Sequence, residues 1–229
     1  MTESTRPPHA SPLAGIRAVT FDVGGTLIKP QPSVGHIYAQ IAARRGVTGL
    51  DPDVLNQRFK AAWRAQPDFR HSREEWASLV DKSFEGFCEP PPSRSFFDEL
   101  YEHFTKADAW HVYDDVRHVL SELKSRNLPL AVISNWDDRL HPLLENLKLR
   151  PFFDSVIVSC DVGVPKPHPL IFERAVVALG VASAEILHLG DEPKADYTGA
   201  RRAGFRTLLL CRDGVRSAPG TIASLREIL

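Results

Sequence analysis

Acidic, amide and basic side chains follow four apolar runs of this chain, each near the point where a run ends. The run RAVTFD ends in Asp22, and later runs are followed by the residues Ser134, Asn135, Lys166, Asp191 and Asp196. Neighbouring carboxylates suit Mg²⁺, a hard cation that prefers oxygen ligands. A carboxylate can also attack phosphorus, while an ammonium and a hydroxyl stabilise the phosphoryl oxygens. The residue types therefore indicate phosphoryl-transfer chemistry.

Each of these residues also has an ordinary structural explanation. An aspartate at a strand end can cap a turn, a serine or asparagine often starts a helix, and a loop lysine is usually solvated. The pair Asp191 and Asp196 can simply favour a helix dipole. The functional interpretation depends on all of them occurring together, at successive strand ends. Gly24, Gly25 and Thr26 support it, because glycines let backbone groups approach a phosphate closely and the threonine adds a hydroxyl.

The elements that must position these residues are five short apolar runs at 17–22, 128–134, 155–159, 186–190 and 206–211. They are nearly continuous in apolar residues, which is typical of strands buried on both faces. Helical patterns at 138–149, 168–179 and 194–204 lie between them. This alternation predicts an α/β fold with a doubly wound parallel sheet, whose ligands lie at the carboxyl ends of the strands.

A long helical block interrupts this alternation. Between residues 30 and 113 we find no convincing strand, and four amphipathic helices are expected at 34–46, 51–66, 72–87 and 93–106. Expected caps are Asp51 with Pro52, Ser72 with Glu75, and Ser93. We predict a flexible tail at 1–14, a core domain at 15–29 and 110–229, and a helical cap domain at 30–109. A helix at 114–127 returns the chain to the sheet.

Composition excludes several classes of function. The net charge of −1 provides no basic field for nucleic acid. No run approaches the roughly 20 apolar residues of a membrane span, and the N-terminus has no apolar core of a secretory signal. Three cysteines without a CxxC pair favour reduced thiols and a cytoplasmic protein. No dimerisation stripe is evident, so the oligomeric state stays open.

The segments DVGGT, ISN, PKPHP and GDEPKAD together resemble the four motifs of the haloacid dehalogenase-like hydrolase superfamily. The resemblance covers about 17–29 and 110–212, and the helical block falls where that superfamily places its cap on a Rossmann-like core. It implies a Mg²⁺-dependent phosphohydrolase that acts on a small phosphorylated molecule through an aspartyl-phosphate intermediate.

The resemblance also implies a role for each matching residue. Asp22 matches the nucleophile and a Mg²⁺ ligand, and Lys166 matches the lysine that stabilises the nucleophile and the phosphate. The other implied metal ligands are the backbone carbonyl of Gly24 and the carboxylates of Asp191 and Asp196. The implied substrate-binding residues are Ser134, Asn135, Gly25 and Thr26.

Gly24 departs from the superfamily's pattern. Its phosphatases carry a second aspartate at this position, which protonates the leaving group and then activates water. Glycine does neither, and general acid–base catalysis is typically worth about 10²–10⁴-fold. The chain is therefore expected to be slow on poor leaving groups. Glu192, a histidine of the helical block or a group on the substrate are the candidate replacements.

Three alternatives remain open at this point. The first is a non-catalytic protein that binds phosphate and Mg²⁺ on this fold. The second is a 2-haloacid dehalogenase, which also lacks the second aspartate; here Asp191 and Asp196 would raise the pKa of Asp22 and spoil the nucleophile. The third is a phosphonatase, which uses a cap lysine, but the candidates Lys60, Lys82 and Lys106 have ordinary surface patterning.

The sequence pattern also predicts the surroundings of several other residues. His188 lies in an apolar run and is expected to be a core residue, and Cys160 is expected to be structural. Helical faces predict that the core of the block contains Trp63, Trp76, Phe84 and Phe87. The residues expected where a cap meets substrate are Tyr38, Phe69, Arg70 and His71.

Overall fold

Six parallel strands form the central sheet in the computed structural model, which describes residues 11–66, 69–214 and 220–229. The strands are β1 (Ala18–Phe21), β4 (Leu130–Ser134), β5 (Ser155–Val158), β6 (Ile186–Gly190), β7 (Arg206–Leu210) and β8 (Thr221–Ile222). Their order is β5-β4-β1-β6-β7-β8, with β1 between β4 and β6. The predicted parallel sheet is confirmed. The strand β8 was not predicted, because two residues are too few to show periodicity.

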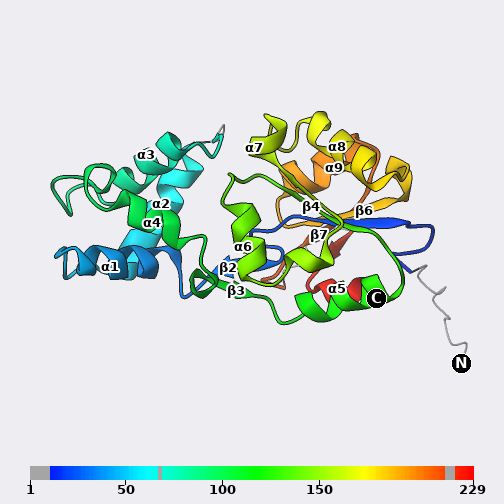
Figure 1. Cartoon of the computed structure of the whole chain (residues 1–229), viewed down its shortest axis with the longest axis horizontal. Coiled ribbons are helices and arrows are strands. Elements are labelled where there is room, and N and C mark those ends of the chain that lie inside the picture. Colours follow the sequence, from blue (N-terminus) through cyan, green and yellow to red (C-terminus); the bar gives the residue numbers. More distant parts are fainter. Residues whose placement is uncertain (1–10, 67–68, 215–219) are drawn as a thin grey trace, which may run out of the picture.

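Helices cover both faces of this sheet (Figure 1). Val19 and Phe21 of β1 pack in one core with α5 (Val116–Ser125) and α6 (Leu140–Asn146). Ala18 packs in the other core, with α8 (Pro169–Leu179) and α9 (Gly199–Arg202). Successive residues of a strand point to opposite faces, so both faces of β1 need apolar residues. The short helix α7 (Ser159–Val162) follows β5 directly. The doubly wound fold is therefore confirmed.

The helical block packs around a core of its own. Its helices are α1 (Val34–Arg44), α2 (Pro52–Arg64), α3 (Arg73–Ser83) and α4 (Phe97–His103). The ring of Tyr38 lies at the centre of this core, with ring centroids of Phe59 at 6.0 Å, Phe84 at 5.6 Å and Phe104 at 6.2 Å. Two expected caps are confirmed: the side chain of Asp51 caps α2, and Ser72 forms a capping box with Glu75 at α3.

The start of the fourth helix was predicted wrongly. Pro92–Arg94 form a 3₁₀ turn, and α4 begins only after Phe96. Ser93 caps no helix; its backbone N–H donates to the carboxylate of Asp81 at 2.8 Å. The three prolines before Ser93 suggested that one helix ends there and the next begins at Ser93. In the structure they belong to a tight turn instead.

A two-stranded antiparallel sheet joins the helical block to the central sheet. It pairs β2 (Ile28–Pro30) with β3 (Trp110–Val112), so the expectation of no strand between residues 30 and 113 is wrong. Three residues a strand left no signal to detect. Trp110 packs against the core of the block and against one core of the sheet. Both passages of the chain between the two regions are therefore tied together.

Two further predictions concern the connection from β6 to β7 and the N-terminal tail. The segment predicted as a helix at 194–204 is a π-helical turn, Pro193–Thr198, followed by α9. Of the predicted tail at 1–14, residues 1–10 lie outside the described residues, and Leu13 packs against a sheet core. The division into core and cap domains stays a prediction. Among the described helices, none combines the length and apolar character needed to cross a membrane.

Candidate active site

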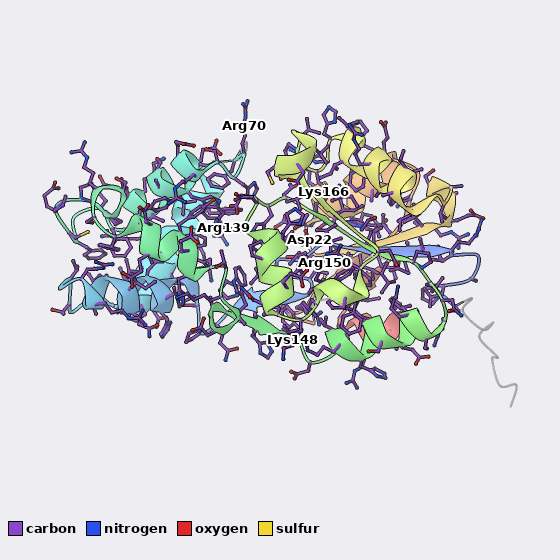
Figure 2. All side chains as sticks on the ribbon, viewed as in Figure 1. Asp22, Arg70, Arg139, Lys148, Arg150 and Lys166 are labelled. Carbon is purple, nitrogen blue, oxygen red and sulfur yellow. The ribbon has the colours of Figure 1, made fainter. Side chains whose placement is uncertain are left out.

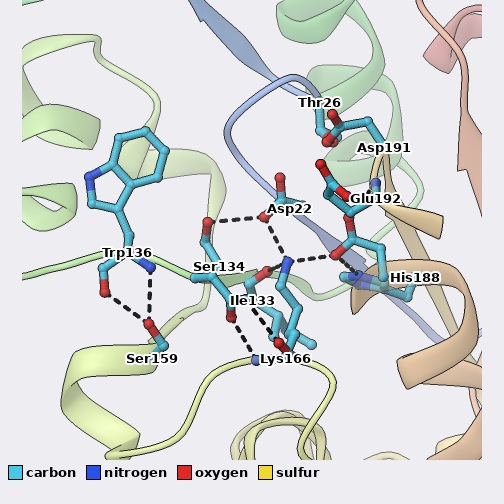
Figure 3. A network of polar contacts seen from close by, with 12 residues as sticks. Asp22, Thr26, Ile133, Ser134, Trp136, Ser159, Lys166, His188, Asp191 and Glu192 are labelled. Carbon is cyan, nitrogen blue, oxygen red and sulfur yellow. Dashed lines mark hydrogen bonds and ion pairs between the residues drawn. The ribbon is translucent and has the colours of Figure 1, made fainter. Parts of the chain in front are cut away.

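Four segments far apart in the sequence bring polar side chains together at the carboxyl ends of β1, β4 and β6 (Figure 3). The Nζ of Lys166 donates to Oδ1 of Asp22 at 2.7 Å, to Oδ1 of Asp196 at 2.6 Å and to the carbonyl of Ile133 at 2.8 Å. The hydroxyl of Ser134 donates to the same Asp22 oxygen at 3.0 Å. Parallel strands end at one edge, so Asp22 meets Ser134 and Lys166 although 112 and 144 positions separate them along the chain.

The charges of this network depend on one another. Burial opposes the charged form of Lys166, but Asp196 and Asp22 outweigh it and raise the pKa of the lysine. Burial likewise opposes ionisation of Asp196, yet Lys166 and His188 hold its pKa below the usual range. Burial raises the pKa of Asp22, and Lys166 offsets part of that rise. Lys166 is therefore the cation that favours the ionised forms of both buried carboxylates.

Asp191 lies beside this network and is more open than Asp196. The hydroxyl of Thr26 donates to its Oδ1 at 3.1 Å. Burial and the negative charges of Asp22 and Asp196 raise the pKa of Asp191 to about 8. Gly25 has a φ of +77°, and a Cβ at this position would collide with the Asp191 carboxylate. Glycine is thus required both by the backbone and by the close approach of the acid.

The residues present fit a divalent cation. Asp22, Asp191 and Asp196 each offer a carboxylate oxygen, and these atoms lie within 4.8 Å of one another. Hard cations such as Mg²⁺ prefer such oxygens. A bound cation would also relieve the repulsion that raises the pKa of Asp191. Asp196 is already held on both oxygens, by Lys166, by His188 and by the backbone N–H of Glu192.

Asn135 fixes the loop that carries Lys166. Its side-chain Oδ1 accepts from the backbone N–H of Lys166 at 2.6 Å, and its Nδ2 donates to the carbonyl of the same residue at 3.0 Å. The structure therefore places Asn135 where it positions the lysine. Its predicted contact with substrate stays a prediction.

Sequence reasoning missed the role of His188 in this network. Its ring is fully buried on β6; Nε2 lies 3.3 Å from Oδ1 of Asp196, and Nδ1 lies 2.9 Å from the hydroxyl of Thr20 on β1. The expectation of a core residue is correct in burial, but this imidazole also bridges two strands below the site. Its place in an apolar run opposite a threonine was the signal available.

Trp136 is the second residue that was missed, and it lies over Gly24. A Cβ added to Gly24 would lie 3.2 Å from the Trp136 ring. That ring packs against Trp110 of β3, with centroids 5.4 Å apart. The backbone N–H and carbonyl of Trp136 both bond to the hydroxyl of Ser159. The space beside the missing acid is therefore bordered by an indole.

A cleft of about 750 Å³ opens between the strand ends and the helical block. Its floor includes Asp22, Gly24, Gly25 and the site's other acids, and its far wall includes Trp63, Phe69 and Trp76. This volume lies in the range typical of small-molecule sites. In Figure 2, Asp22 and Lys166 lie at the end of the sheet nearest the block, with Arg139 between the two regions.

Of the four residues predicted to lie where a cap meets substrate, three line the cleft and one does not. Tyr38, Phe69 and His71 line the cleft, whereas Arg70 is exposed and points outward (Figure 2). Trp63 was wrongly assigned to the core, because it is 36% exposed and lines the cleft instead. Phe84 is buried in the core as predicted, and Trp76 and Phe87 pack against it.

The remaining candidate nucleophiles lie in unsuitable surroundings. Lys82 and Lys106 are exposed and are not among the residues that line the cleft; Lys60 lines it but is also exposed. Cys160 is exposed as a residue, but partial desolvation of its thiol and the neighbouring Asp161 raise its pKa to about 12, which disfavours a nucleophilic thiolate. All three cysteines, which lie in the described part of the chain, are free thiols.

Comparison with known proteins assigns the family. The sequence profile described as "Hydrolase: haloacid dehalogenase-like hydrolase" matches residues 16–204. The chain is 36% identical to mouse haloacid dehalogenase-like hydrolase domain-containing protein 3, over 85% of this chain and 82% of that protein. It is 27% identical to phosphoserine phosphatase of Thermus thermophilus, over 93% and 98% of the two chains.

A solved structure agrees with this assignment. The crystal structure of a HAD phosphatase from Thermococcus onnurineus superposes with a TM-score of 0.69 at 25% identity, over 93% of this chain and 96% of that one. Fold, profile and relatives point the same way, and the chain belongs to the haloacid dehalogenase-like hydrolase family.

Proposed function

We propose that this chain is a Mg²⁺-dependent phosphohydrolase that acts on a small phosphorylated molecule through an aspartyl phosphate formed on Asp22. The observation that carries the proposal is the placement of Asp22 between Lys166 and the acids Asp191 and Asp196. The phosphatases among its relatives support the reaction class. Because its cysteines are free thiols, we propose a cytoplasmic location. We propose no nucleic-acid or membrane partner.

The reaction has two steps on the same carboxylate. The Asp22 carboxylate attacks phosphorus, the bond from phosphorus to the leaving-group oxygen breaks, and the electron pair departs with that oxygen. Water then attacks the phosphorus of the aspartyl phosphate, which releases inorganic phosphate and restores the carboxylate. Lys166 and Ser134 hold Oδ1 of Asp22 throughout.

The metal and the neighbouring groups divide the stabilisation of charge. Mg²⁺ held by Asp22, Asp191, Asp196 and the Gly24 carbonyl would neutralise charge on the phosphoryl oxygens. Lys166 favours the ionised, nucleophilic form of Asp22 against the burial that raises its pKa. Gly25, Ser134 and Asn135 line the end of the cleft where the phosphate would bind, and Thr26 supports that end through its hydrogen bond to Asp191. Asp191 and Asp196 disfavour a dehalogenase, since they place negative charge beside Asp22 and raise its pKa.

The deciding experiment is turnover of a panel of phosphate esters, from p-nitrophenyl phosphate and acetyl phosphate to sugar phosphates, with and without Mg²⁺. We expect Mg²⁺-dependent turnover that is lost in Asp22→Asn. A non-catalytic protein that binds phosphate and Mg²⁺ is the second candidate, favoured by the absence of a side chain at Gly24. Turnover no greater than in Asp22→Asn, with Mg²⁺ binding intact, would establish that second function instead.

Gly24 should limit the enzyme with poor leaving groups. Gly24→Asp restores an acid next to the leaving group, although its Cβ must displace the Trp136 ring by a few tenths of an ångström. We expect it to raise turnover of alkyl phosphates by about 10-fold or more relative to Gly24→Asn, which has the same shape and no acid. Equal rates in the two variants would show that position 24 does not limit proton transfer.

A further inference from the structure

The cleft has two chemically different ends. At the strand ends it presents the carboxylates and Lys166, whereas at the helical block it presents aromatic rings. Trp63, Phe69 and Trp76 form one aromatic group, with ring centroids 4.9 to 5.4 Å apart. Trp110 and Trp136 form a second group beside Gly24. A phosphate bound at Asp22 therefore directs the rest of its ester toward aromatic walls.

Two polar groups in the block's wall have hydrogen-bonding capacity that no described residue uses. These are Nδ1 of His71 and Nε2 of Gln66, both buried. His71 lies 5.0 Å from the Phe69 ring and has a φ of +65°, a strained conformation for a residue with a side chain. Buried polar groups are normally paired, so these two indicate a ligand that carries a polar substituent.

Charge is scarce at this end of the cleft. Arg139, which is buried between the block and the sheet, is neutralised by Asp137 through bonds of 2.8 and 2.7 Å. It also lies 3.5 Å from the centre of the Tyr101 ring. The lining cations Lys60 and Arg64 are exposed. A sugar with many hydroxyls would find few buried partners here, whereas a flat ring would find several faces and edges to pack against.

We propose that the substrate is a phosphate monoester of a planar aromatic alcohol, whose ring packs between the two tryptophan groups and carries a polar group that pairs with His71 or Gln66. This inference rests on the proposed function and extends it to a substrate class. It also accounts for Gly24. When the phosphorus–oxygen bond breaks, the electron pair leaves on an aryloxide, whose charge the ring delocalises, so an acid at position 24 is not required.

The test uses phosphonates, which bind but cannot be hydrolysed at the carbon–phosphorus bond. Titration calorimetry with Mg²⁺ present compares phenylphosphonate with propylphosphonate on the full chain. We expect the phenyl compound to bind about 10-fold more tightly. Trp63→Ala should weaken the phenyl compound about 5-fold and leave the propyl compound unchanged. The control Val177→Ala removes an exposed apolar side chain that does not line the cleft and should change neither.

A second comparison tests the polar substituent. The better of the meta and para isomers of hydroxyphenylphosphonate should bind more tightly than phenylphosphonate, and Gln66→Leu or His71→Phe should remove that gain. Two variants are used because His71→Phe changes a strained buried position. No gain in the native chain, or a gain that survives in both variants, would overturn the pairing.

Failure of this inference can be told apart from failure of the proposed function. Equal affinity for phenyl and propyl compounds, or an equal loss of both in Trp63→Ala, overturns the aromatic substrate even when phosphate esters are turned over. Preference for the phenyl compound without any turnover supports the aromatic site and rejects the hydrolase. Binding of neither compound overturns the aromatic substrate, and absence of ester turnover as well would overturn the proposed function.

Discussion

The two ends of the cleft hold their residues by different means. At the strand ends, charged groups are buried and each is fixed by several bonds, as Lys166 is by Asp22, Asp196 and the carbonyl of Ile133. At the helical block, rings pack against rings, and His71 and Gln66 are left with unused capacity. Chemistry needs charges at fixed positions, which strands provide. Selection of a leaving group needs only shape and a few polar contacts, which helices and their loops can vary.

The largest effect should come from removing the cation that holds the charged end together. Lys166→Met leaves Asp22 and Asp196 buried against one another without compensation. We expect turnover to fall to background and the free energy of unfolding to drop by about 3–5 kcal/mol at pH 7. Urea denaturation and the phosphate-ester panel measure the two effects.

Lys124→Met is the matched control, since Lys124 bonds to Asp154 in a pair that is exposed to solvent. The free energy of unfolding of Lys124→Met should fall by less than about 1 kcal/mol. A similar loss in the two variants would mean that the Lys166 network contributes no more than a surface ion pair.

Asp191→Asn should separate metal binding from stability. The raised pKa of Asp191, about 8, reflects burial and repulsion by Asp22 and Asp196. Replacement by the neutral amide should therefore stabilise the metal-free protein by about 1 kcal/mol. It should also weaken Mg²⁺ by about 10-fold or more, seen as loss of the Mg²⁺-dependent rise in Tm. Asp138→Asn, at an exposed position, is the control. Unchanged Mg²⁺ affinity in Asp191→Asn would remove Asp191 from the metal site.

The aromatic end should respond to acid. Burial lowers the pKa of His71 to about 4, below the usual 6.5. The unfolded chain then takes up the proton first, so stability is lost as pH falls from 6.5 toward 4. This histidine accounts for a loss of about 2 kcal/mol between pH 7 and pH 5. His71→Gln, which does not titrate, should lose that much less over the same interval in urea denaturation.

The control for this titration is His36→Gln, because His36 is exposed. The free energy of unfolding of His36→Gln should equal that of the native chain at pH 7 and at pH 5. If His71→Gln and the native chain lose equal stability on acidification, His71 is not held neutral in the cleft wall.

The smallest effect should come from Ser134→Ala. It removes one hydrogen bond of 3.0 Å to Asp22, while Lys166 still holds the same oxygen. We expect turnover to fall about 10-fold and stability by about 1 kcal/mol. Ser125→Ala, at an exposed serine that bonds to its own helix, should change neither. A loss of turnover as large as in Lys166→Met would show that the hydroxyl has a larger role than holding Asp22.

Much of the fold was predictable, because its strands are buried on both faces. The runs at 128–134 and 186–190 differ from β4 and β6 by at most two residues. A strand of this kind is nearly all apolar and stands out from any neighbour. The strands that were missed, β2, β3 and β8, owe their existence to tertiary contacts rather than to local periodicity.

The candidate site was predictable where polar residues follow strands, and not where rings meet across the chain. Asp22, Ser134 and Lys166 come from different segments, yet parallel topology alone requires their approach. Nothing in the sequence indicates that Trp136 lies over Gly24 or that His188 reaches Asp196. Those contacts depend on the directions of side chains from different elements. The periodicity of a sequence predicts such directions only within one helix or strand.

The ribbon of β2 and β3 has a consequence for how the two ends of the cleft communicate. Both chain passages to the helical block run through it, and Trp110 on β3 packs against Trp136. A rotation of the block about this ribbon would therefore displace the indole that borders Gly24. Opening of the cleft would therefore change the access of water to the leaving-group oxygen. A ligand held by the block would act on the reacting atoms through the contact between these two tryptophan rings.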